Sequence, residues 1–142
     1  MKRTIIIVFS VLVGGFLLIQ LIPYGHQHTN PSVVQEPNWD SLQTRELAQR
    51  ACFDCHSNES VWPWYSNIAP VSWLVQRDVN DGRRRVNFSD WGRTRETDDI
   101  PRVVQNGQMP MPIFLIMHPE ARLTQAEKDA LVSGLQATIR GQ

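Results

Sequence analysis

Residues 41–56, which read Ser-Leu-Gln-Thr-Arg-Glu-Leu-Ala-Gln-Arg-Ala-Cys-Phe-Asp-Cys-His, decide how this chain folds. Asp40 or Ser41 can cap a helix that runs to about Ala51, because short polar side chains accept hydrogen bonds from the free amides of a first helical turn. Leucine and alanine recur at helical spacing and give this helix a modest apolar face. The helix therefore delivers the chain directly to its only two cysteines and a histidine.

The pattern Cys52-x-x-Cys55-His56 is that of covalent, c-type haem attachment. Two thiols three residues apart can reach the two vinyl groups on one porphyrin edge, and His56 then lies under the iron as the proximal ligand. A thioredoxin-like dithiol would need a βαβ surround, and a zinc site would need further ligands, of which only His118 remains in the folded part. We therefore expect one covalently bound haem c, with Cys52 and Cys55 holding it and His56 ligating its iron.

The rest of the chain has helical patterns without β-alternation or internal repeats. Three further helices are expected: Val71–Val79, ended by Asp81-Gly82; Ile100–Asn106, closed by Gly107; and a C-terminal helix to about Arg140, begun by the capping box Thr124-Gln125-Ala126-Glu127. The stretch Met109-Pro110-Met111-Pro112 cannot continue a helix, because proline lacks the N–H that a helix needs. The expected fold class is all-α.

The N-terminus predicts a membrane anchor. Lys2 and Arg3 precede the nearly apolar stretch Ile5 to Ile22, whose 18 residues would rise roughly 27 Å as a helix, close to the hydrocarbon thickness. A cleaved signal peptide is the alternative, but the stretch lacks the small-residue cleavage pattern. The positive-inside rule puts the N-terminus in the cytoplasm.

We therefore expect a single-pass protein of an inner membrane with its haem domain in the periplasm. The expected division is residues 1–23 as anchor, 24–38 as linker and 39–142 as the c-type haem-binding domain. The formal net charge is zero, and the one basic run, Arg83-Arg84-Arg85, is too short to indicate a nucleic-acid binder. The expected partners are redox proteins and, through the N-terminal helix, the membrane.

Four side chains compete for the sixth position on the iron: Met109, Met111, Met117 and His118. Methionine stabilises ferrous iron and raises the reduction potential. Met109 precedes a proline in a segment that packing can hold rigid, so we favour it as the second metal ligand. An open sixth position remains an alternative.

Other candidate cofactor-binding residues are Trp64, Tyr65 and Arg84. The aromatic pair can wall the haem and donate a hydrogen bond to a propionate, or it can belong to an ordinary core. Arg84 can pair with a propionate, although a run of three arginines is more often a solvated face.

Several further motifs follow the attachment pattern in order. They are Trp62-Pro63-Trp64-Tyr65-Ser66, Ile68-Ala69-Pro70, Asp78-Val79, Gly82-Arg83-Arg84, Asn87-Phe88-Ser89, Met109-Pro110 and His118-Pro119-Glu120-Ala121-Arg122-Leu123. With them the chain resembles the bacterial haem-binding domain family of small c-type cytochromes, over about residues 39 to 137. The resemblance implies a cytochrome c-like helical domain around one haem and Met109 as the natural axial ligand. A second Met-Pro pair, Met111-Pro112, leaves that choice open.

The function expected first is electron transfer in the periplasm, by an electron carrier rather than an enzyme. The alternative is a haem-based, peroxidase-like enzyme or a sensor of small gases or redox state, which would need an open or displaceable sixth ligand. A module that carries haem without turnover is a third hypothesis.

Overall fold

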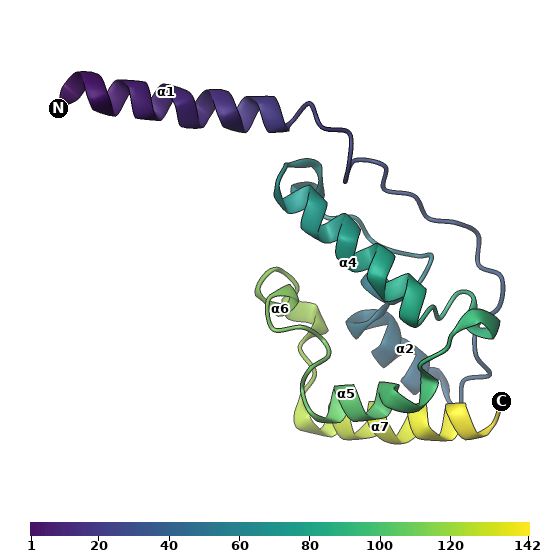
Figure 1. Ribbon diagram of the computed structural model, residues 1–142. Coiled ribbons are helices and arrows are strands. Elements are labelled where there is room, and N and C mark those ends of the chain that lie inside the picture. Colours follow the sequence, from purple (N-terminus) through teal and green to yellow (C-terminus); the bar gives the residue numbers. More distant parts are fainter. The chain divides into compact units, whose positions relative to one another are not determined.

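The computed structural model describes residues 1–142, and every regular element in it is helical (Figure 1). The α-helices are α1 (Lys2–Ile19), α2 (Leu42–Ala51), α3 (Phe53–His56), α4 (Val71–Arg85), α5 (Ile100–Gln105), α6 (Phe114–Met117) and α7 (Gln125–Arg140). Four short 3-10 turns join them: η1 (Trp64–Asn67), η2 (Trp91–Arg93), η3 (Thr97–Asp99) and η4 (Pro119–Ala121). The one β-type pairing is an isolated parallel bridge between Gln35 and Asp90. The predicted all-α class is confirmed.

The chain forms two compact units. The first contains residues 1–29 and 62–78, and the second contains residues 30–61 and 79–142. The chain passes from one unit to the other within α4. The division into anchor, linker and haem-binding domain stays a prediction.

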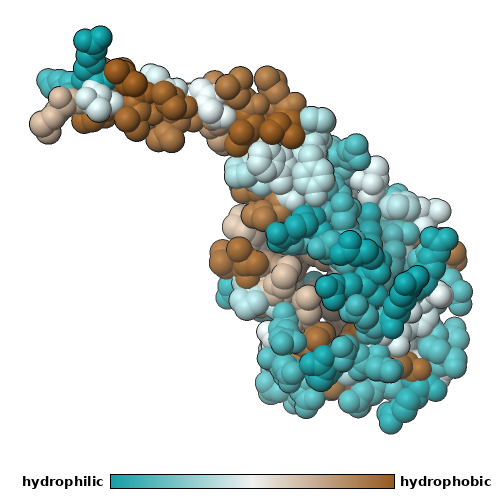
Figure 2. Space-filling view, viewed as in Figure 1, coloured by the Kyte–Doolittle hydropathy of each residue, from teal (hydrophilic) through white to brown (hydrophobic).

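The first unit contains the apolar helix α1, which is mostly brown in the hydropathy colouring of Figure 2. None of its residues is buried, and its length and composition are sufficient for a membrane span. The side chain of Gln20, just after the helix, donates to the carbonyl oxygen of Ala69 (3.0 Å) and accepts from its amide (2.9 Å). His28 stacks on Trp62, with 4.6 Å between the ring centroids. The residues that follow α1 are thus held against the second segment of this unit.

In the second unit, local caps begin the two helices that frame the core. The Ser41 side chain accepts from the amide of Thr44 (3.2 Å), so Ser41 caps α2. Thr124 and Glu127 form the predicted capping box of α7, in which each side chain accepts from the other residue's amide. Glu127 also accepts a bond from Arg50 of α2, and the Arg50 guanidinium with the Thr124 amide lowers the pKa of Glu127 to about 2.

Helices α2 and α7 approach each other most closely at Gly134. A Cβ atom at that position would collide with the Oγ1 of Thr44, and it would lie 2.8 Å from its Cγ2. Both positions are buried, so the Thr44 side chain cannot turn into solvent to make room. Gly134 therefore permits the crossing that closes the core around Leu47, Leu131 and Leu135.

An aromatic stack extends this core toward the cysteines. Phe53 of α3 stacks on Phe88 at 5.6 Å, and Phe88 stacks on Trp91 at 5.8 Å. Trp39 lies 5.3 Å from Phe88. Aromatic rings at such separations bury large apolar areas and prefer defined orientations. The stack therefore fixes the turn that carries Cys52 and Cys55 relative to residues 86–91.

The helix expected at Val71–Val79 runs farther than predicted. Asp81-Gly82 was expected to end it, but α4 continues to Arg85. Gly82 serves a different purpose, because its missing side chain admits the backbone of Cys55. By contrast, Gly107 has a φ of +71° just beyond α5 and ends that helix as predicted.

We predict that Gly134→Ala destabilises the protein by about 1–3 kcal/mol, the usual cost of overpacking a well-packed core. Chemical denaturation followed by circular dichroism measures this change. Gly92→Ala is the matched control, because a Cβ atom there meets only the Gln35 side chain at 3.9 Å. Equal stability of the two variants would contradict a close α2–α7 crossing.

Candidate functional site

The attachment motif forms one tight turn, which consists of Cys52 at the end of α2 and of α3 itself. The amide of His56 donates to the carbonyl oxygen of Cys52 (2.9 Å), and the amide of Cys55 donates to the same oxygen (3.2 Å). Residues four apart on a helical turn share a face, so Cys52 and His56 lie on the same side. Phe53 faces the other way and is 2% exposed. The turn is therefore anchored in the core by Phe53, while Cys52 and His56 line a cavity.

That cavity has a volume of about 340 Å³ and lies wholly within the second unit. Its lining residues come from α2, the attachment turn, the end of α4, residues 86–104 and the methionine loop. They are Ala51, Cys52, His56, Arg85, Val86, Phe88, Glu96, Asp99, Ile100, Arg102, Val103, Val104 and Met109. Mostly apolar walls with a few polar groups, at a volume of about 300–1,000 Å³, are typical of cofactor pockets.

The His56 ring is held in a defined state. Its Nδ1–H donates to the carbonyl oxygen of Val86 at 3.2 Å, because a carbonyl can only accept. The other ring nitrogen, Nε2, is then unprotonated and carries a lone pair that can bind a metal. Burial lowers the pKa of His56, which also favours the neutral ring. The structure thus prepares this residue as a metal ligand.

Among the four candidates for the sixth ligand, Met109 lines the cavity, while Met111, Met117 and His118 do not. The amide of Met109 donates to the carbonyl oxygen of Val103 (3.0 Å), which ties the methionine loop to α5. His118 is engaged elsewhere: its Nδ1 lies 3.0 Å from a carboxylate oxygen of Glu120, and its ring stacks on Phe114 at 4.0 Å. One cavity therefore receives both His56 and a methionine thioether.

The comparison with protein families agrees with this geometry. Residues 14–137 match the model of a haem-binding domain. The chain belongs to the haem-binding domain family. No curated protein and no solved structure gives a significant match. The expected membership is confirmed, and the protein is a haem protein.

The residues of the cavity fit a haem. Phe88, Ile100 and Val104 supply apolar surface, and His56 supplies an imidazole nitrogen. Arg85 and Arg102 supply two guanidinium groups, which pair with Glu96 and Asp99 of the same lining and are of the kind that binds propionate carboxylates. The family and the cavity thus point to the same cofactor.

Of the two cysteines, Cys52 lacks the lowered pKa of a redox-active thiol. The pair forms no disulfide, and burial raises the pKa of the Cys52 thiol to about 12. Redox-active dithiols instead have lowered pKa values and exposed, electropositive surroundings. This thiol is protonated at neutral pH, which disfavours the thioredoxin-like alternative.

Cys55 and the remaining expected residues lie outside the cavity lining. Trp64 and Tyr65 belong to the first unit, where their rings meet edge to face at 5.8 Å and Trp64 is 70% exposed. Arg84 forms an ion pair with Asp81 at 3.0 Å, and its side chain is 71% exposed. Their roles toward the haem stay predictions.

Sequence reasoning missed Gly82 and Val86 as parts of the site, and among the three consecutive arginines it chose Arg84, whereas Arg85 lines the cavity. Gly82 packs on the backbone of Cys55, and Val86 bonds His56. Residues 82, 85 and 86 are three or four apart and share a face of α4. If α4 had been expected to continue to Arg85, helical spacing from Gly82 would have favoured Arg85 over Arg84.

We predict that Gly82→Ala impairs haem incorporation, because the added methyl collides with the carbonyl of Cys55 and displaces the attachment turn. The haem absorbance per molecule of purified protein should fall severalfold, and stability should fall by about 1–3 kcal/mol. Gly92→Ala serves again as the control and should keep its haem. An unchanged haem content in Gly82→Ala would show that the turn tolerates displacement.

Proposed function

We propose that this protein is a membrane-anchored c-type cytochrome that carries single electrons in the periplasm. Cys52 and Cys55 would hold one haem covalently, and His56 and Met109 would ligate its iron. The observation that carries the proposal is a single cavity lined by Cys52, His56 and Met109. A haem with both axial positions filled by protein leaves no site for substrate, which favours electron transfer over catalysis.

Covalent attachment fits the spacing and the state of the thiols. Each S–H would add across a vinyl double bond of the haem, with sulfur bonding one carbon and hydrogen the other, so the attachment would need no oxidant. Bound haem supplies an iron that alternates between the ferric and ferrous states. The protein supplies a neutral imidazole held by Val86 and an apolar wall that limits contact with water.

The membrane assignment is supported by α1 and its flanking charges. The helix contains 18 residues and reaches roughly 27 Å at 1.5 Å per residue. Lys2 and Arg3 are the only charged residues before Glu36, which favours a cytoplasmic N-terminus. An anchored carrier is confined near membrane-bound donors and acceptors, and this confinement raises its effective concentration there.

We predict that the double variant Cys52→Ala with Cys55→Ala loses covalent haem. The full chain would be produced together with cytochrome c maturation proteins and examined by haem staining after denaturing electrophoresis. His118→Ala should retain the stain, because that ring does not line the cavity. Haem that stays with the double variant through denaturation would overturn the covalent assignment.

We also predict that Met109→Ala lowers the reduction potential by roughly 0.1 V or more, within the range of about 0.8 V that axial ligands span. The weak far-red band of methionine bound to ferric iron should disappear. Met111→Ala is the matched control and should leave both unchanged.

The same spectra discriminate the alternative function. A high-spin spectrum of the unaltered protein that shifts with cyanide or carbon monoxide would indicate an open sixth position. That outcome would favour a peroxidase-like enzyme or a gas sensor over an electron carrier.

A further inference from the structure

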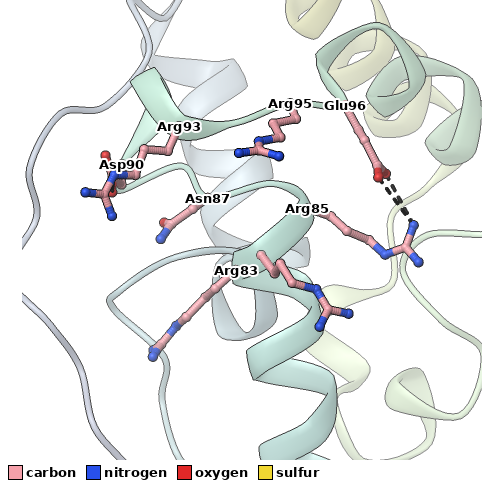
Figure 3. A pocket seen from close by; sticks show the side chains of 8 residues that line it. Arg83, Arg85, Asn87, Asp90, Arg93, Arg95 and Glu96 are labelled. Carbon is pink, nitrogen blue, oxygen red and sulfur yellow. Dashed lines mark hydrogen bonds and ion pairs between the residues drawn. The ribbon is translucent and has the colours of Figure 1, made fainter.

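A second cavity of about 610 Å³ lies at the C-terminal end of α4 and along residues 87–96, within the second unit (Figure 3). We name it the arginine pocket, after the five arginines that line it. They are Arg83, Arg84, Arg85, Arg93 and Arg95. The haem assignment leaves most of these side chains without a role.

The arginine pocket is positively charged, whereas the domain around it has a negative net charge. Five arginines face only two acids there, Asp90 and Glu96, which leaves an excess of three positive charges. Once Lys2 and Arg3 are set aside, acidic residues outnumber basic ones by two in the rest of the chain. The pocket is therefore a positive region on a domain whose net charge is negative, and it can attract an anionic surface that the whole domain would repel.

Most of these guanidinium groups are available to a partner. The side chains of Arg85 and Arg93 are 61% and 87% exposed, and their ion pairs to Glu96 and Asp90 are 3.3 and 3.4 Å long. Exposed pairs of this kind contribute little free energy, so an incoming carboxylate can replace the internal one. The Arg95 side chain has no internal partner in the structure, and in Figure 3 no dashed line reaches it. Arg83 differs, because it donates to the carbonyl oxygen of Ser57 at 2.7 Å.

The arginine pocket adjoins the haem cavity. Arg85 and Glu96 line both of them, so the two cavities share one wall. A protein that docks in the pocket is therefore brought next to the cofactor. Such proximity is needed for electron transfer, and complementary charges raise the rate of encounter.

We propose that the arginine pocket is the docking surface for an acidic redox partner, which presents carboxylates to Arg93 and Arg95. This inference rests on the proposed electron-transfer function. It names the surface through which electrons pass and the charge of the protein that exchanges them.

The test uses the haem-loaded full chain in nonionic detergent and two oxidants of opposite charge. Ferricyanide is a trivalent anion, and tris(phenanthroline)cobalt(III) is a trivalent cation. Stopped-flow absorbance measures how fast each oxidises the ferrous protein over a range of ionic strengths. We expect the ferricyanide rate to fall as salt rises, because salt screens an attraction, and the cobalt rate to rise. A net negative charge acting alone would give the opposite pair of slopes.

A charge-matched pair of variants localises the effect. Arg93→Gln with Arg95→Gln should slow ferricyanide about threefold or more at low ionic strength and flatten its salt dependence. Arg122→Gln with Arg140→Gln removes the same charge elsewhere, from side chains that bond only backbone carbonyls. This control should keep the ferricyanide rate within a factor of about two.

Poly-L-glutamate provides a carboxylate surface of the kind proposed. It should slow ferricyanide oxidation of the unaltered protein and of the control, and it should have little effect on Arg93→Gln with Arg95→Gln. If nanodiscs of phosphatidylglycerol suppress the rate and poly-L-glutamate does not, the pocket faces anionic lipid and the proposal is overturned. Equal effects of the two variant pairs would also overturn it. Failure of both oxidants to react would instead reject the electron-transfer function itself.

Discussion

The contact between Gly82 and the backbone of Cys55 is the constraint on which the site depends. It joins α4 to the attachment turn at a separation that no side chain could tolerate. One helical turn later, the carbonyl oxygen of Val86 reaches His56 Nδ1 at 3.2 Å and leaves the other ring nitrogen for a metal. A small displacement of α4 would break both contacts. The position of the His56 ring, and which of its nitrogens is left for a metal, therefore depend on a single close helix contact.

The aromatic part of the core packs against the attachment turn and also forms part of the cavity wall. Phe53 lies within the motif but belongs to the aromatic stack of Trp39, Phe88 and Trp91. Phe88 has a double role, since it packs in the stack and also lines the cavity. The crossing of α2 and α7 at Gly134 brings their leucines into the same core cluster as this stack. The same side chains thus stabilise the fold and shape the site, which ties haem binding to folding.

The net charge of the chain does not reveal how unevenly the charged residues are distributed. The formal net charge is zero, and most arginines have an acidic partner nearby. Around the end of α4, however, arginines are dense enough to leave a local excess beside the haem cavity. Because interactions between charges at a surface are screened within about 8–10 Å at physiological salt, a docking partner responds to that local excess more than to the total.

Local chemistry allowed much to be predicted from the sequence. The caps at Ser41 and Thr124, the end of α5 at Gly107 and the apolar helix at the N-terminus depend on residues within one or two turns of each other. The spacing of Cys52, Cys55 and His56 is equally local, so the motif indicated a haem and the residues that would hold it. The family match agrees with that reading.

Only the tertiary structure decided which of several similar residues lie at the site. Met109 lines the cavity and Met111 does not, although both precede a proline. Arg85 lines it and Arg84 does not, although the two are adjacent. Gly82 continues a helix that sequence reasoning ended there. At Gly82 and Val86 the answer depends on contacts with residues more than twenty positions away in the chain, and a pattern of neighbouring residues carries no information about such contacts.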